Sequence, residues 1–193
     1  MNGSAQHWSE FQGDRTFDRL TQSETDFIAQ RDSFYMATVS SMGWPYIQHR
    51  GGPIGFLRVL GEKTLGFADL RGNRQYINVG NIGADGRTAL ILMDYPNRRR
   101  LKLYARAETR DLQEDPHLHQ CLALPNYRGK AERVMLLHLE VFDWNCPQHI
   151  TPRFTETELA QAVGLISQRM SALEEENRRL RSLIRGVAPG DIV

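Results

Sequence analysis

The chain has 193 residues, 40% of them hydrophobic and 24% charged, with a formal net charge of +1. That balance is ordinary for a globular protein and gives no overall electrostatic reason to expect a nucleic acid as partner. No apolar run approaches the roughly 18 residues of a membrane span, and the N-terminal segment lacks the features of a secretion signal, so we expect a cytoplasmic protein. Cys121 and Cys146 lack the spacing of a disulfide framework or a zinc site, and we expect no metal.

The first expected element is a short helix. Thr21 followed by Glu24 has the form of a capping box, in which two side chains bind the exposed amides at a helix start. We therefore expect a helix from this point to about Arg31, covering one end of the domain that follows.

Strand-like segments follow from Phe34 onward. FYMATVSS and PYIQHR are β-rich and are joined by a turn that contains Gly43 and Pro45, which predicts a hairpin. Further strands are expected at GFLRVL (55–60), KTLGFADL (63–70), RTALILMDY (87–95), RLKLYARAETR (100–110) and RVMLLHLEVFDW (133–144). Such regular spacing favours a barrel or a sandwich. Residues 72–83 and 115–124 have the pattern of short connecting helices, and Pro116 suits the first turn of the second one.

The C-terminal segment predicts one long helix. Thr155 and Glu158 form a second capping box, and the helical pattern then runs to Gly186, interrupted only by Gly164. A seven-residue repeat places Val163, Met170, Asn177 and Ile184 at position a, and Leu159, Ile166, Leu173 and Leu180 at position d. We divide the chain into a domain of residues 1–154 and a helix with a short tail, residues 155–193.

Polar residues of this helix favour a parallel, two-stranded coiled coil. A buried asparagine at position a, here Asn177, costs stability but disfavours other registers and oligomeric states. In a parallel pair, position g of one helix faces position e of the other. Arg169 then meets Glu174 and Glu176 meets Arg181, so both contacts are attractive. The alternative is a helix that lies on its own barrel, with Asn177 near the edge of the contact.

Three polar stretches of the domain are candidates for a binding site. In QHRGGP (48–53), glycines that follow a strand allow a flat group to approach the backbone, although a bulge or loop is the commoner reason for them. Residues 71–75 lie at the entry to an expected helix, where exposed amides, the helix dipole and guanidinium donors suit a phosphate; a polar turn is the alternative. The cationic run at 98–102 follows a turn, and a solvated turn explains most such runs.

In this order and spacing, the segments resemble the pyridoxamine 5'-phosphate oxidase-like FMN-binding split-barrel family. The resemblance covers residues 34–111 and rests on ATVSSMGWPYIQHRGGPIGF, on TLGFADL leading into RGNRQYINVGNI, and on TALILMDYPNRRRLKLYARAE. It implies a mainly β (α+β) fold, an FMN-binding split β-barrel with short connecting helices, here followed by the long coiled-coil helix. It further implies a homodimer with FMN at the subunit interface, and a flavin-dependent oxidoreductase with a small-molecule substrate.

The resemblance also implies which residues bind the cofactor. The strand along the flavin and the next strand end correspond to Gln48, His49, Arg50, Gly51, Gly52, Phe67, Ala68 and Asp69. The segment that holds the phosphate corresponds to Asn73, Arg74 and Gln75. Arg100 matches a polar side chain near the isoalloxazine ring, and Trp144 and Arg153 match residues that reach FMN across the dimer.

Some positions depart from the family pattern. Pro53 stands where true pyridoxamine phosphate oxidases have a lysine that contacts substrate phosphate, and the chain lacks recognisable versions of their later substrate-binding segments, so vitamin B6 oxidation is not expected. Gln75 replaces a family lysine, which weakens the hold on phosphate unless Arg71 or Arg50 compensates. The sequence identifies no catalytic acid or base. The alternatives are a non-catalytic flavin-binding or flavin-sensing dimer, a haem-binding relative that uses His49, His138 or His149, and a split barrel without a ligand.

Overall fold

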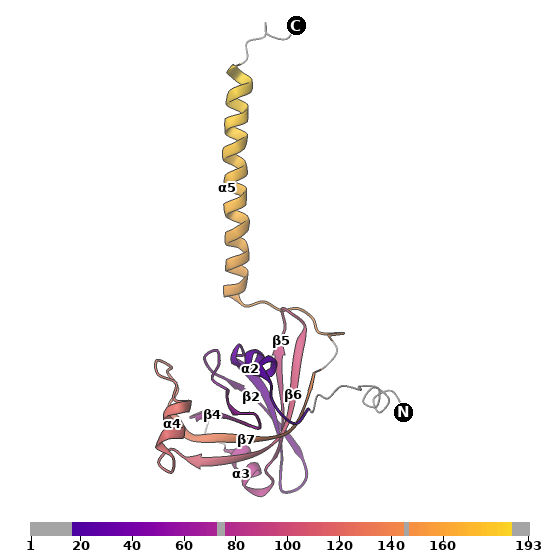
Figure 1. Cartoon of the computed structure of the whole chain (residues 1–193), viewed down its shortest axis with the longest axis vertical. Coiled ribbons are helices and arrows are strands. Elements are labelled where there is room, and N and C mark those ends of the chain that lie inside the picture. Colours follow the sequence, from indigo (N-terminus) through magenta and orange to yellow (C-terminus); the bar gives the residue numbers. More distant parts are fainter. Residues whose placement is uncertain (1–16, 73–75, 145–146, 187–193) are drawn as a thin grey trace. The chain divides into compact units, whose positions relative to one another are not determined.

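The computed structural model describes residues 17–72, 76–144 and 147–186 (Figure 1). It divides into two compact units, Met1–Ile150 and Thr151–Val193. None of the described helices combines the length and apolar character that a membrane span requires.

The first unit is built on one sheet of seven antiparallel strands in the order β2-β1-β5-β6-β7-β4-β3. The strands are β1 Ser33–Val39, β2 Pro45–Gly51, β3 Arg58–Gly61, β4 Thr64–Leu70, β5 Arg87–Asp94, β6 Arg99–Asp111 and β7 Ala131–Trp144. All seven coincide with segments in which the sequence predicted strands. The mainly β prediction is therefore confirmed.

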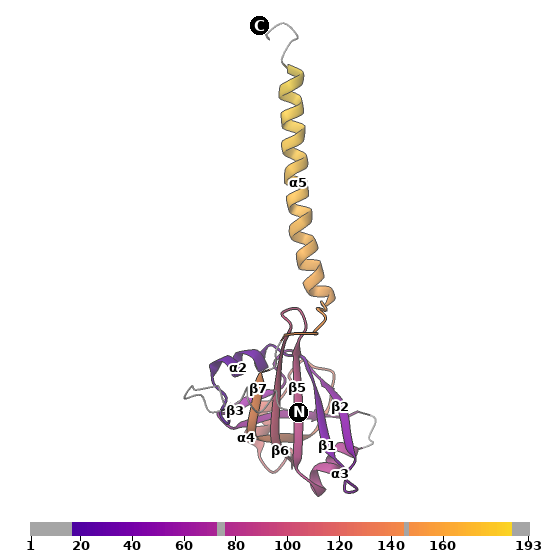
Figure 2. The ribbon, with the colours of Figure 1, turned by 90° about the vertical axis from the view of Figure 1, so that its right-hand side faces the viewer.

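The sheet curls so that strands distant in its order meet across the core (Figure 2). Three strands separate β1 from β4 in the sheet, yet the rings of Phe34 and Phe67 lie 5.4 Å apart, edge to face. Alternate residues of β1 and β5 are buried, as a strand with one face toward the core requires. The result is the partly closed barrel that the sequence predicted, with β2 and β3 as its two free edges.

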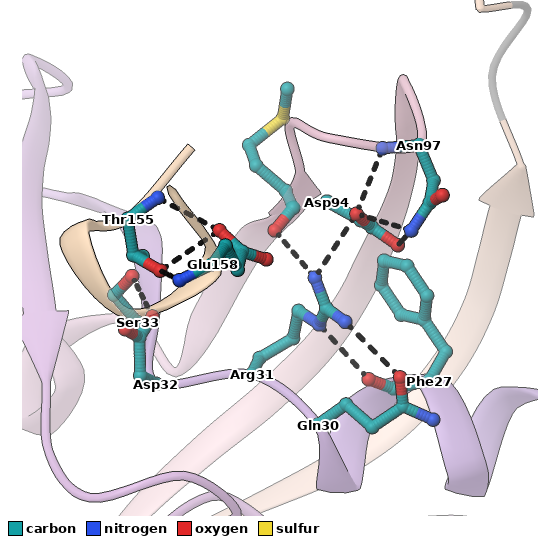
Figure 3. Close-up of polar contacts among 10 residues, drawn as sticks. Phe27, Gln30, Arg31, Asp32, Ser33, Asp94, Asn97, Thr155 and Glu158 are labelled. Carbon is teal, nitrogen blue, oxygen red and sulfur yellow. Dashed lines mark hydrogen bonds and ion pairs between the residues drawn. The ribbon is translucent and has the colours of Figure 1, made fainter. Parts of the chain in front are cut away.

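Helix α2, Gln22–Ala29, begins at Thr21 with the predicted capping box. Arg31, just beyond its end, donates to the carbonyl oxygens of Phe27 and Met93, both at 3.2 Å, and pairs with Asp94 at 3.7 Å (Figure 3). The carboxylate of Asp94 also accepts from the side-chain amide of Asn97. This network fixes the end of α2 to the turn between β5 and β6.

Two short helices connect strands, as predicted. In α3, Ile77–Ala84, buried Asn78 and Asn81 hydrogen-bond Thr38 on β1 at 2.8 and 3.0 Å. Because these amides are satisfied by one hydroxyl, they fix the rotation of α3 on the sheet. Helix α4, Pro116–Leu122, starts at Asp115, whose carboxylate accepts from the amide of Leu118.

In the second unit, α5 spans Glu156–Gly186, 31 residues. The predicted capping box is present, since Glu158 accepts from the amide and hydroxyl of Thr155 at 2.8 and 2.9 Å (Figure 3). The helix boundaries thus agree with those expected from the sequence.

Replacement of Gly164 by alanine is expected to stabilise α5 by about 1 kcal/mol, because glycine is the costlier residue in a helix interior. A Cβ added there meets no atom within 4 Å. Amide hydrogen exchange across residues 160–168 measures the change as slower exchange. Gly86→Ala is the contrasting variant: its Cβ would lie 3.0 Å from the carbonyl oxygen of Ala107, so it should lower stability. Unchanged exchange in Gly164→Ala would contradict the expectation.

Candidate functional site

An open pocket lies beside β2, which is an edge strand of the barrel. It is bounded by β2, the end of β4, the start of α3 and the start of β7. Its lining residues are Tyr46, Gln48, Arg50, Asp69, Leu70, Gly72, Tyr76, Ile77, Asn78, Val79 and Glu132.

Strand alternation decides which predicted residues of β2 reach the pocket. Gln48 pairs with Met36, a core residue of β1, so Gln48 and Arg50 lie on the inner face and line the pocket. His49 lies on the outer face instead, with its ring centroid 5.4 Å from that of Tyr35. The structure therefore brings two of these three side chains together and directs the third away.

Asp69 joins the two walls of the pocket. Its carboxylate lies 2.6 Å from Arg50 on β2 and 3.5 Å from Arg133 on β7. The side chain of Asp69 is 8% exposed and that of Arg50 is 14% exposed, so this is a largely buried ion pair. Phe67 and Ala68, the neighbouring predicted residues, do not line the pocket; Phe67 packs in the core and Ala68 faces the other side of β4.

The wall opposite β2 is a polar network. Glu132 at the start of β7 lies 3.5 Å from Arg71 and 3.3 Å from Arg133, and it accepts from the hydroxyl of Tyr76 at 3.3 Å. The guanidinium of Arg133 also stacks over the Tyr76 ring at 4.9 Å. Together with the pair on Asp69, these contacts surround the pocket with three guanidiniums and two carboxylates, an excess of one positive charge.

The first turn of α3 faces the same pocket. Its N-cap residue, Tyr76, has a left-handed backbone with φ of 48°, and within the described residues no side chain caps the helix amides. Uncapped amides at a helix start favour an anion. The predicted phosphate residues Asn73, Arg74 and Gln75 precede this turn and lie outside the described residues.

The glycines after β2 have a packing role within the barrel. A Cβ on Gly52 would lie 2.6 Å from the ring of Phe56, and Phe56 stacks on Phe34 in the core. A Cβ on Gly51 would lie 3.2 Å from the side chain of His49. Close packing against Phe56 thus explains Gly52 without any ligand.

The other predicted cofactor residues lie away from this pocket. Arg100 on β6 is on the outer face, next to Met93 of β5, and its buried Nε atom has no hydrogen-bond partner among the described groups. Trp144 ends β7, whereas Glu132 of the pocket is near the start of the same strand. Arg153 belongs to the second unit. Of the predicted haem-ligand candidates, His138 pairs with Glu108 at 3.3 Å and His149 is exposed, and neither lines the pocket.

Sequence reasoning missed several residues of the pocket. Tyr46 could have been found, because it precedes Gln48 and Arg50 at the same two-residue spacing. Glu132 and Arg133 gave no such signal, since they are more than sixty positions along the chain from Asp69 and only the pairing of β4 with β7 brings them together.

Comparison with known proteins agrees with this fold. A family model described as pyridoxamine 5'-phosphate oxidase matches residues 20–137. A structure titled as an FMN-binding protein from Syntrophomonas wolfei is 14% identical, covers 74% of this chain and 94% of that one, and has a TM-score of 0.50. HupZ from Group A Streptococcus is 18% identical, covers 70% and 99%, and also has a TM-score of 0.50.

Identities this low show the shared fold alone. No curated protein matches the chain. The family model, however, spans more than half of the sequence and contains β1 to β6 and all lining residues of the pocket. The chain therefore belongs to the pyridoxamine 5'-phosphate oxidase family.

Proposed function

We propose that this protein binds FMN and acts, as a homodimer, as a flavin-dependent oxidoreductase on a small-molecule substrate. The observation that carries the proposal is the pocket itself. It combines inward side chains of β2, Gln48 and Arg50, with the uncapped start of α3, and the segment 73–75 that the resemblance assigns to phosphate leads into that helix.

Polar side-chain groups of the pocket remain available to form hydrogen bonds to a flavin. The Nε atom of Arg50 is buried without a hydrogen-bond partner, and the side-chain amide of Gln48 makes no hydrogen bond within the described part of the chain. Both groups are therefore available to donate to the carbonyl and nitrogen acceptors of a flavin ring.

The opposite end of the pocket suits the phosphate of FMN. The start of α3 offers backbone amides and the positive end of its dipole. Arg74, in the segment that precedes α3 in the sequence, would supply a charge-assisted hydrogen bond to this phosphate. A dianionic phosphate is thus favoured at this end.

The outer face of the barrel supports the homodimer. A row of apolar residues crosses five strands in register: Ile47, Ala37, Ala89, Tyr104 and Val141. Ile47 is 66% exposed, Tyr104 43% and Val141 40%, which is costly for a face in water. A second copy is the occupant we propose, and it would also cover Arg100 on the same face and bring it to the partner's cofactor.

In this proposal, bound FMN supplies transfer of a hydride or of electrons. The chain's own residues bind and orient it. Asp69 fixes Arg50 at the pocket, so that its guanidinium meets the cofactor without first losing conformational freedom. The described residues identify no general acid or base.

The absorbance spectrum of freshly purified protein, with mass identification of what heat releases from it, tests the cofactor. Flavin bands and released FMN are expected. A Soret band would replace the proposal with haem binding. A featureless spectrum that added FMN does not change would overturn flavin binding altogether. Bound flavin that no reductant or oxidant turns over would leave the binding role and overturn the oxidoreductase.

Replacement of Arg74 by alanine is expected to weaken FMN binding by about 2 kcal/mol, because it removes one charge-assisted hydrogen bond to phosphate. A fluorescence titration measures the dissociation constant. Arg58→Ala is the matched control, since Arg58 is an exposed arginine on β3 away from the pocket and should leave affinity unchanged. Equal affinity of the Arg74 variant and wild type would remove this residue from the site.

A further inference from the structure

Helix α5 carries an exposed apolar stripe. The exposed fractions are 51% for Leu159, 61% for Val163, 59% for Ile166, 56% for Met170, 43% for Leu173 and 50% for Leu180. Together with Asn177, these residues follow one another at alternating spacings of four and three, so they lie along one side of the helix. Apolar surface of this extent is normally buried against a partner.

Charged residues flank the stripe in a self-complementary order. Within the described part of the chain, none of the four flanking residues makes an ion pair: Arg169 and Glu176 at position g, and Glu174 and Arg181 at position e. The ion pair that α5 does contain, Arg178 with Glu175 at 2.6 Å, lies at positions b and f, away from the stripe. The four flanking charges are therefore free to pair across an interface.

A second copy in parallel orientation satisfies all four charges. Position g of one helix then faces position e of the next heptad in the other, so Arg169 meets Glu174 and Glu176 meets Arg181 of the partner copy. By symmetry each pair occurs twice. The sequence is thus complementary to itself, which identifies a second copy of this chain as the occupant.

Asn177 supports the same orientation. It occupies position a within the stripe and is exposed in the single chain. In a parallel pair in register, the two Asn177 side chains meet and hydrogen-bond to each other, whereas other registers leave each amide against apolar groups. The polar Asn177 in an otherwise apolar stripe therefore favours one register of the helix pair.

We propose that α5 pairs with α5 of a second copy in a parallel, two-stranded coiled coil. The helix lies outside the family match, which ends at residue 137, so this interface goes beyond the flavin site. The helix spans about 45 Å at about 1.5 Å per residue. It gives the protein a second dimer contact that is independent of flavin binding.

Site-specific disulfide formation in the full-length chain tests the pairing. Cys121 and Cys146 are first replaced by serine, and one cysteine is then introduced by Leu180→Cys at position d or by Ser182→Cys at position f. A disulfide requires Cα atoms within roughly 7 Å, which a parallel pair provides at position d but not on the outer side. We expect a covalent dimer from the first variant and loss of it in the second. Equal cross-linking of both, or of neither, would overturn the proposal.

Charge reversal tests the orientation independently. In the Leu180→Cys chain, Arg169→Glu with Glu176→Arg makes every g–e contact repulsive between identical copies, and Glu174→Arg with Arg181→Glu does the same. Each double variant alone should lose the disulfide, and co-expression of the two should restore it, because the mixed pair is again attractive throughout. Undiminished cross-linking of each variant alone would contradict the parallel register. FMN titration of the same proteins keeps this result separate from the flavin proposal, since affinity should stay unchanged.

Discussion

Asp69→Asn is expected to lower the free energy of unfolding by about 3 kcal/mol, because it leaves two guanidiniums without their shared carboxylate. Asp69 lies 2.6 Å from Arg50 and 3.5 Å from Arg133, whose side chains are only 14% and 20% exposed, and Arg133 alone retains a second carboxylate, that of Glu132 at 3.3 Å. Asparagine keeps the shape of the side chain but not its charge, so the two cations then repel each other in a partly desolvated site. Urea unfolding with the barrel's tryptophan fluorescence as signal measures the loss.

Glu140→Gln is the matched control for this prediction. It also removes a carboxylate from an ion pair, Arg106 with Glu140 at 2.7 Å, but these side chains are 61% and 52% exposed. An exposed pair contributes at most about 1 kcal/mol, since water and salt screen it. If the two variants lost the same small amount, Asp69 would not hold the β2 and β7 walls together, and its role in orienting Arg50 would fail with it.

Local patterns predicted the elements of this fold well. The capping boxes at Thr21 and Thr155 marked the starts of α2 and α5 because they report a local interaction between residues three apart. Strand alternation and turn residues marked the hairpin of β1 and β2 for the same reason. The curl of the sheet, by contrast, depends on contacts such as that of Phe34 with Phe67, between residues far apart in the chain. Only the family resemblance anticipated it.

The pocket was predictable only in part, because side-chain direction and distant partners decide it. Gln48, Arg50 and Asp69 were expected and line the pocket, but alternation along the strands turns His49 and Ala68 to the opposite faces. The directions of the His49 and Ala68 side chains could have been predicted from the two-residue period of a strand alone. Arg133 could not be anticipated, because its contact with Asp69 follows from the register of β4 on β7.

Trp144→Ala is expected to cost about 3 to 5 kcal/mol of stability, as removal of a large packed aromatic side chain does. Trp144 packs edge to face on Phe27 at 4.8 Å, carries the guanidinium of Arg99 over its ring at 4.8 Å, and donates from Nε1 to the fully buried carboxylate of Glu24 at 2.7 Å. These contacts connect β7 and β6 to α2. Trp44→Ala is the control, since Trp44 is 73% exposed and should change stability by no more than about 0.5 kcal/mol.

The milder variant Trp144→Phe separates this structural role from the proposed contact with cofactor. It keeps an aromatic ring on Phe27 but leaves the buried Glu24 without its indole donor, so about 1 to 2 kcal/mol should be lost. Trp144 and Glu132 are twelve positions apart on β7, and Trp144 does not line the pocket of its own chain. The contact with FMN that we propose for Trp144 is therefore one across the dimer. If the variant is less stable and also binds FMN more weakly, the contact across the dimer is supported. If it is less stable but its FMN affinity is unchanged, Trp144 only stabilises its own barrel.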